Sequence, residues 1–146
     1  MKIVICGSVV FADKMKEVAE KLEQLGHQIE LPFYVKKIIA GEVSLADFIK
    51  VKDQSGDSGF RAIANEDLIK RYYRLIGQSD AILVVNIDKK GIKNYIGGNT
   101  LMEIGFAYVL DKKIFLLNDV PEIDFLKDEI LAVKPIVIND NLSLIK

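Results

Sequence analysis

Residues 2–8, Lys2-Ile-Val-Ile-Cys-Gly-Ser8, decide how the rest of the sequence is interpreted. The apolar and mostly β-branched run from Ile3 to Cys6 is typical of a strand buried on both faces of a parallel sheet. The Gly7-Ser8 pair then breaks the run and predicts a turn. We therefore expect a buried parallel strand whose carboxyl end leads into a turn.

The next segment continues this pattern with a helix and a second strand. Residues Asp13–Leu25 carry apolar side chains at a helical spacing, namely Met15, Val18, Ala19, Leu22 and Leu25. Gly26 follows as the residue that ends the helix, and His27–Leu31 forms a strand that Pro32 stops. Together these elements make one β-α-β unit of about 30 residues.

Strands and helices alternate along the remaining sequence. We expect strands over Ala81–Asn86, Lys113–Leu117 and Pro135–Ile138, helices over Tyr34–Val51, Arg61–Ile76, Thr100–Leu110 and Asp124–Leu131, and loops over Lys52–Gly59 and Asp88–Gly98. Alternation of this kind predicts an α/β fold, a three-layer sandwich around a mostly parallel five-stranded sheet. The expected strand order is the flavodoxin-like 2-1-3-4-5, with residues 1–146 forming a single Rossmann-like domain.

Composition narrows the possible functions. Half of the 146 residues are apolar, and the formal net charge is -1, which disfavours binding to a nucleic acid polymer. One cysteine and one histidine exclude a disulfide framework, a zinc cluster and a Ser-His-Asp triad. No signal peptide or membrane-spanning run is evident, so we expect a cytoplasmic protein with no membrane partner. We also expect no metal and no cofactor.

The fold predicts where a ligand binds. In sheets of this kind ligands lie outside the carboxyl ends of the strands, near the point where the strand order reverses. The site should include the Gly7-Ser8 turn, the loop after Asn86 and the segment after Leu117. The loop after Asn86 is basic because it contains Lys89, Lys90 and Lys93. This composition fits a solvated loop better than a phosphate-binding one.

Glu103 is the strongest candidate for chemistry. It is the only charged residue in the apolar helix predicted over Thr100–Leu110. A structural alternative is a capping box, because Thr100 and Glu103 have the spacing in which the glutamate binds the helix N-terminus. If Asn99 caps the helix instead, Glu103 is free to face the ligand edge.

Other residues have weaker signals. Gly7-Ser8 can form an anion-binding nest, but the sequence GSVVFAD lacks the dinucleotide-binding glycine pattern. Asp80 precedes a strand, where a capping role is common. Of the pair Tyr72 and Tyr73, one ring can stack on a base. Cys6 is interpreted as a buried apolar residue and His27 as a structural one.

Three segments together resemble a known family. They are the strand ending in Cys6-Gly-Ser8, the strand Asp80-Ala-Ile-Leu-Val-Val85, and Gly97-Gly-Asn-Thr-x-x-Glu103-Ile-Gly-Phe-Ala107. They resemble the nucleoside 2-deoxyribosyltransferase family, which includes the 2′-deoxynucleoside 5′-phosphate N-hydrolases. The resemblance implies a flavodoxin-like fold and a homodimer or higher homo-oligomer with shared active sites. It also implies a nucleoside or nucleotide as the small-molecule partner.

The resemblance also implies roles for individual residues. Glu103 matches the glutamate that attacks the anomeric carbon and forms a glycosyl ester, which water or a second base resolves. The residues expected to bind substrate are Gly7, Ser8, Asp80, Asn86, Gly97, Gly98, Asn99 and Thr100. Three positions depart from the family pattern. Tyr72 stands where the family has an aspartate, Val4 stands where it often has a tyrosine, and Val10 stands where the hydrolases have a phosphate-binding arginine. Tyr72 is therefore the candidate for assisting the leaving base.

These observations leave three hypotheses. The first is an enzyme, a hydrolase or transferase, that breaks the N-glycosidic bond of a (deoxy)nucleoside or nucleotide with Glu103 as nucleophile. The second is a nucleotide-binding or regulatory module of the same fold that has lost catalysis. The third is a structural domain in which Glu103 only caps a helix.

Overall fold

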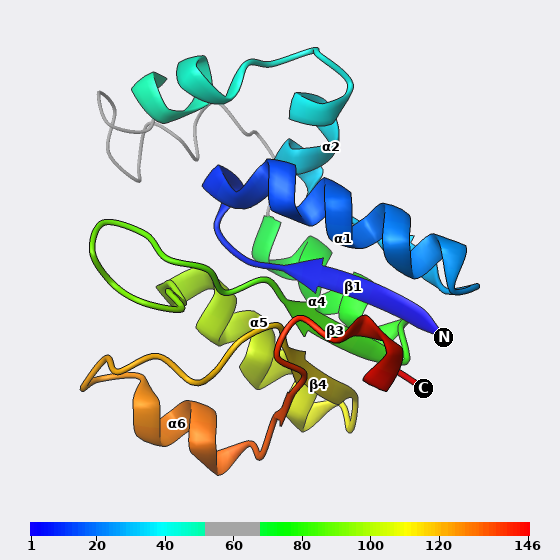
Figure 1. Cartoon of the computed structure of the whole chain (residues 1–146), viewed down its shortest axis with the longest axis vertical. Coiled ribbons are helices and arrows are strands. Elements are labelled where there is room, and N and C mark those ends of the chain that lie inside the picture. Colours follow the sequence, from blue (N-terminus) through cyan, green and yellow to red (C-terminus); the bar gives the residue numbers. More distant parts are fainter. Residues whose placement is uncertain (52–67) are drawn as a thin grey trace.

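Five parallel strands form one sheet in the computed structural model, which describes residues 1–51 and 68–146. The sheet order is β2-β1-β3-β4-β5, so the predicted order is confirmed. In Figure 1 the labelled strands β1, β3 and β4 run from right to left, so their carboxyl ends lie at the left edge of the sheet. The strands are β1 (Lys2–Cys6), β2 (Gln28–Glu30), β3 (Ala81–Val84), β4 (Lys113–Leu116) and β5 (Ile136–Val137).

Helices cover both faces of this sheet and make it the middle of three layers (Figure 1). One face packs against α1 (Ala12–Gln24), α2 (Phe33–Ile39) and the short 3₁₀ helix η2 (Leu142–Leu144). The other face packs against α4 (Leu68–Gly77), α5 (Gly98–Val109) and α6 (Lys127–Ala132). A further 3₁₀ turn, η1 (Val9–Phe11), links β1 to α1.

Strand alternation divides the interior into two cores. In β1, Ile3 and Ile5 face the core under α1, whereas Val4 and Cys6 face the core under α4 and α5. All four side chains are almost completely buried. This alternation follows from the two-residue period of a strand, and β1, β3 and β4 place buried side chains in both cores.

The predicted helix over Tyr34–Val51 is wrong because the chain breaks after α2. Gly41 has a φ of 76°, a conformation that favours glycine and ends the helix. The hydroxyl of Ser44 then accepts a hydrogen bond from the backbone N–H of Asp47 at 3.0 Å, which caps a new helix over residues 45–51. The loop predicted over Lys52–Gly59 lies outside the described residues, as does the first half of the helix predicted over Arg61–Ile76.

The predicted helices near the site also shift. α5 begins at Gly98 rather than Thr100, with Gly97 as its N-cap, and α6 begins at Lys127 rather than Asp124. Residues 124–126 form a turn instead, which the bond from the N–H of Leu126 to the carbonyl of Ile123 closes at 3.0 Å. In residues 1–51 and 68–146, no helix has the length and apolar character needed to cross a membrane.

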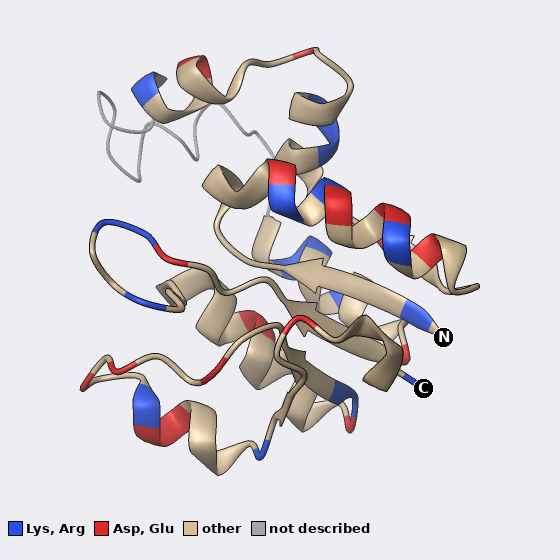
Figure 2. Cartoon of the chain, in the orientation of Figure 1, with Lys and Arg blue, Asp and Glu red and all other residues tan. Residues whose placement is uncertain are grey.

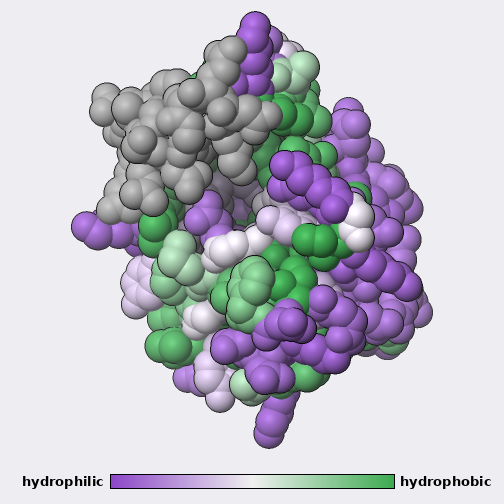
Figure 3. All heavy atoms as spheres, turned by 90° about the vertical axis from the view of Figure 1, so that its left-hand side faces the viewer, coloured by the Kyte–Doolittle hydropathy of each residue, from purple (hydrophilic) through white to green (hydrophobic). Residues whose placement is uncertain are grey.

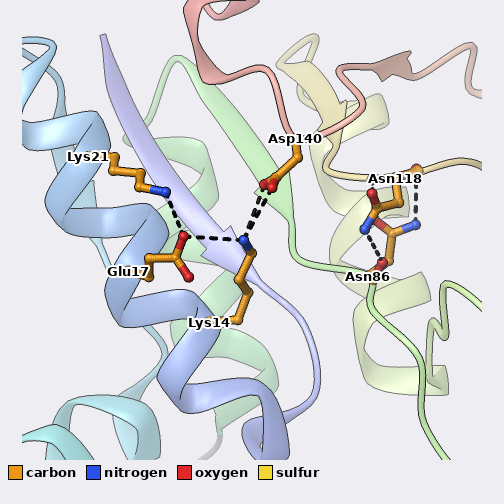
Figure 4. Close-up of polar contacts among 6 residues, drawn as sticks. All are labelled: Lys14, Glu17, Lys21, Asn86, Asn118 and Asp140. Carbon is orange, nitrogen blue, oxygen red and sulfur yellow. Dashed lines mark hydrogen bonds and ion pairs between the residues drawn. The ribbon is translucent and has the colours of Figure 1, made fainter.

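Basic and acidic residues alternate along α1 (Figure 2). Glu17 accepts hydrogen bonds from Lys21 at 2.6 Å and from Lys14 at 3.4 Å. Lys14 also pairs with Asp140 at 3.3 Å, which connects α1 to the segment after β5 (Figure 4). These pairs are solvent-exposed, so each contributes about 1 kcal/mol at most.

Gly7 lies in the turn after β1, close to the backbone that follows β3. Its φ is 147°, and a Cβ atom placed there would lie 2.8 Å from the carbonyl oxygen of Val85 and 2.8 Å from the Cε of Met15. The carbonyl belongs to the backbone beyond β3, which cannot move without disturbing the sheet. The turn at the ligand edge therefore requires glycine.

We expect Gly7→Ala to lower the free energy of unfolding by about 3 kcal/mol or more, because backbone strain adds to a steric clash. Gly26→Ala is the matched control, since Gly26 has a φ of 86° but no heavy atom lies within 4 Å of the place that its Cβ would take. That variant should lose only about 1 kcal/mol. Urea denaturation measures the free energy of unfolding of both variants. Equal losses in Gly7→Ala and Gly26→Ala would contradict the steric clash at Gly7.

Candidate active site

A cavity of about 350 Å³ lies at the carboxyl edge of the sheet, where the strand order predicts a ligand site. This edge faces the viewer in Figure 3, where hydrophobic and near-neutral residues gather at the centre beside hydrophilic flanks. The cavity is lined by the turn after β1, the start of α2, α4, the loop after β3 and the first turns of α5. Segments far apart in the sequence therefore meet around one volume.

Most of the predicted site residues meet in this cavity. Tyr72 reaches it from α4, and Glu103 reaches it from α5. The other predicted residues that line it are Gly7, Ser8, Gly97, Gly98, Asn99 and Thr100. Of these, Thr100 is buried and Gly98 and Asn99 are exposed. The cavity thus combines a carboxyl group, a phenol, and the backbone of two turns.

Glu103 does not take part in a capping box. α5 has Gly97 at its N-cap and Gly98 as its first residue, so Glu103 is the sixth residue of the helix rather than the third. Asn99, the alternative cap, is already inside the helix. The Glu103 side chain instead lines the cavity, next to Ile104, which points into the core under α5.

The apolar surroundings change the acidity of Glu103. Burial raises the pKa of its carboxyl group to about 7, because desolvation disfavours the charged form. A hydrogen bond from the thiol of Cys6 acts in the opposite direction and favours the carboxylate. Near neutral pH, Glu103 is therefore divided between its acid and its carboxylate form.

Cys6 is a neighbour of Glu103 that the sequence interpretation missed. It is 1% exposed at the end of β1, and its side chain faces α5. Burial raises the pKa of this thiol well above its ordinary value, and the negative charge of Glu103 raises it further. The two-residue period of β1 offered a signal, since Cys6 shares its face with Val4. The sequence could not show that Glu103 lies opposite that face.

Tyr72 is held by the start of α2. Its hydroxyl oxygen accepts a hydrogen bond from the backbone N–H of Phe33 at 2.7 Å. Burial raises the pKa of Tyr72 above its ordinary value, the hydrogen bond from Phe33 opposes this effect, and the negative charge of Glu103 adds to it. The phenol therefore keeps its proton at neutral pH and can donate a hydrogen bond.

Lys89 also differs from the expectation, because the sequence predicted it to lie in a solvated loop. A tight turn at Lys90 and Gly91, with φ values of 49° and 77°, returns the chain so that Lys89 and Ile92 exchange backbone hydrogen bonds at 3.0 and 2.9 Å. The ammonium of Lys89 then donates to the hydroxyl of Ser8 at 3.0 Å and lies 4.7 Å from the ring centre of Tyr95. Instead of being fully solvated, Lys89 supplies a positive charge to the cavity wall.

Two predicted substrate-binding residues do not line the cavity. Asp80 lies before β3, at the opposite edge of the sheet, where its carboxylate accepts the backbone N–H of Lys2 at 2.7 Å. Asn86 is completely buried, and its side-chain amide and backbone carbonyl exchange hydrogen bonds with Asn118 at 2.9 to 3.1 Å (Figure 4). These bonds join the segments after β3 and β4.

Aromatic rings form much of the remaining wall. Tyr34 and Phe48 have ring centres 5.1 Å apart, and both line the cavity. Phe106 lines it from α5 and packs edge-on against Tyr73, with ring centres 5.4 Å apart. Flat aromatic walls of this kind suit a planar ligand.

Comparisons with protein families, curated proteins and solved structures give matches only among the solved structures. No protein-family model matches the chain, and no curated protein matches it. The chain is similar to the CMP N-glycosidase BcmB of Clostridium botulinum, at 18% sequence identity and a TM-score of 0.45. The match covers 94% of this chain and 85% of that chain.

The raised pKa of Glu103 predicts a stability that depends on pH. The folded state binds the Glu103 proton more tightly than the unfolded state, whose pKa is near 4.5, so stability falls as the pH rises from about 4.5 to about 7. Glu103→Gln removes this loss. We expect the variant to be more stable than the parent protein by up to about 3 kcal/mol at pH 8 and equally stable below pH 4.5.

Urea denaturation across this pH range measures the difference. Glu23→Gln is the control, because Glu23 is an exposed residue of α1. It should show no comparable pH-dependent gain. A Glu103→Gln variant that is no more stable than the parent at pH 8 would contradict the burial of the charge.

Proposed function

We propose that the protein breaks the N-glycosidic bond of a nucleoside or nucleotide, with Glu103 as the nucleophile. The observation that carries this proposal is the carboxyl group of Glu103, which lines a cavity at the carboxyl edge of the sheet and has a pKa of about 7. Strongly shifted carboxyl groups in cavities are typical of functional sites. The resemblance of the Gly97–Ala107 segment to the deoxyribosyltransferases supports the same role.

The proposed reaction has two steps. The carboxylate of Glu103 attacks the anomeric carbon of the sugar, a C–O bond forms, and the base leaves with the electron pair of the C–N bond. Water then attacks the ester, leaves its hydroxyl on the sugar and its proton on the base, and restores the carboxylate. A second base in place of water would give transfer rather than hydrolysis.

The other cavity residues have supporting roles in this proposal. The Tyr72 phenol donates a hydrogen bond to the leaving base, whereas its raised pKa works against complete proton transfer. The rings of Tyr34, Phe48 and Phe106 offer surfaces for the base. Lys89 and Ser8 offer a charged and a neutral hydrogen-bond donor to an anionic group on the sugar.

Glu103→Gln should reduce kcat for base release by about a thousandfold or more, because the amide cannot act as the nucleophile. The experiment incubates the protein with a panel of nucleosides and 5′-monophosphates and follows free base by chromatography. Glu23→Gln should retain full activity. For the parent protein, kcat/KM should rise with pH to a plateau, with its midpoint at about 7 as Glu103 ionises.

The same panel separates catalysis from binding alone. A ligand that raises the melting temperature without any base release, at any pH between about 6 and 9, would favour a binding module and overturn the enzymatic proposal. Base release that survives in Glu103→Gln would still show an enzyme, but it would contradict the role of Glu103 as the nucleophile.

Lys89 should determine whether a phosphate is preferred. We expect Lys89→Met to lower kcat/KM for a 5′-monophosphate by about tenfold to a hundredfold, the effect of losing one charged hydrogen bond. Activity on the corresponding nucleoside should stay within about twofold. Lys93→Met is the control, since Lys93 is an exposed residue of the same loop. Equal losses on both substrates would contradict this role.

A further inference from the structure

We propose that Asn86 is a positioning residue for Lys89. Its hydrogen bonds to the segment after β4 fix the base of the loop formed by residues 87–95, and this loop holds the ammonium of Lys89 in the cavity wall. The effect on substrate choice rests on the function proposed above, whereas the placement of Lys89 does not. A residue that does not line the cavity thereby controls how strongly the site holds an anionic group on the substrate.

Asn86 and Asn118 bind each other reciprocally and are called the asparagine pair (Figure 4). The Oδ1 of Asn86 accepts the backbone N–H of Asn118 at 2.9 Å, and its Nδ2 donates to the carbonyls of Asn118 at 3.1 Å and Asp119 at 3.0 Å. The side-chain amide of Asn118 donates to the backbone carbonyl of Asn86 at 3.0 Å. Asn86 is 0% exposed, so water does not replace a lost bond, and the backbone at this position is held in one orientation.

The loop that follows Asn86 is cross-linked within itself, so it moves as a unit with its base. The backbone N–H of Tyr95 donates to the carbonyl of Ile87 at 3.0 Å, which closes the loop. The carboxylate of Asp88 accepts the backbone N–H of Asn94 at 3.0 Å and adds a second cross-link. A displacement of the base is therefore transmitted to the rest of the loop.

Lys89 depends on this placement because it reaches across the sheet, away from the asparagine pair. β3 lies between β1 and β4 in the sheet. Asn118 belongs to the segment after β4, whereas the hydroxyl of Ser8, which accepts from Lys89 at 3.0 Å, belongs to the turn after β1. Hydrogen bonds weaken steeply as their geometry worsens, so a loop released from Asn118 loses the contact at Ser8.

NMR of protein with carbon-13-labelled lysine tests the placement without any ligand. The ammonium of Lys89 lies 4.7 Å from the ring centre of Tyr95, so the ring shifts the adjacent methylene protons upfield of those of exposed lysines. The signal is assigned by its loss in Lys89→Met. Asn86→Ala removes the side-chain hydrogen bonds of Asn86, and the signal should move to the position of the exposed lysines. An unchanged signal, or no upfield lysine signal in the parent protein, would overturn the proposal.

Asn118→Ala supplies the same comparison with a milder change if Asn86→Ala does not fold. It removes the bond from the Asn118 side chain to the carbonyl of Asn86 and keeps the bonds that the Asn86 side chain makes to the backbone. The Lys89 signal should move part of the way to the position of the exposed lysines. If only this variant can be measured, an unchanged signal overturns the proposal.

Ser79→Ala is the matched control. Ser79 is 3% exposed, and its hydroxyl donates to the carbonyl of Ile76 at 2.8 Å near the opposite end of β3. The variant therefore loses a buried hydrogen bond without disturbing the base of the loop. Its Lys89 signal should match that of the parent. A signal displaced as far as in Asn86→Ala would indicate general loosening of the fold and contradict the proposal.

The kinetic consequence shows whether Asn86 acts through Lys89. Asn86→Ala should lower the ratio of kcat/KM for a 5′-monophosphate to that for the nucleoside by about tenfold, because the anionic group loses its charged partner. In the double variant Asn86→Ala/Lys89→Met, the ratio should equal that of Lys89→Met alone. Losses that multiply in the double variant would contradict an action through Lys89. If the parent protein releases no base, the proposed function fails, and the NMR comparison still decides the placement of Lys89.

Discussion

The parallel pairing of β1 with β3 is the interaction on which the rest of the structure depends. It aligns Cys6 with Val84, and the backbone N–H of Val85 extends the pairing by donating to the carbonyl of Cys6 at 2.8 Å. The turn after β1 and the loop after β3 therefore leave the sheet side by side. Ser8 and Lys89 come within hydrogen-bonding distance although 81 positions separate them in the sequence. Only glycine fits at position 7, because the paired backbone passes so close.

A second consequence of this pairing is the desolvation of Glu103. α5 packs on the face of the sheet that Val4 and Cys6 share, and this places an ionisable carboxyl group beside an apolar core. Such a group weakens the folded state at neutral pH, where its charged form is disfavoured. Local features that oppose stability are often retained for function. The thiol of Cys6 acts in the opposite direction to burial and favours the charged form.

The proposed site does not depend on a histidine or a metal-binding cysteine cluster. Its walls combine aromatic rings, the ammonium of Lys89 and the carboxyl group of Glu103. Acid and base strength come from burial rather than from an imidazole, since desolvation alone moves the pKa of a carboxyl group to the neutral range. Burial raises the pKa of the single cysteine well above its ordinary value, so its thiol stays protonated at neutral pH.

The amino-acid sequence was sufficient to predict the strand order, both helical layers and Glu103 as the candidate residue, because hydrophobic periodicity reports which side of each element is buried. The family resemblance added the interpretation of Glu103 as a nucleophile, which stays a proposal. Contacts between elements emerged only from the folded structure. The contact of Ser8 with Lys89, and the absence of Asp80 and Asn86 from the cavity lining, depend on which side chains face one another across the sheet and its loops. Hydrophobic periodicity does not identify these contacting side chains, because the same pattern of buried residues is compatible with many ways of packing the elements together.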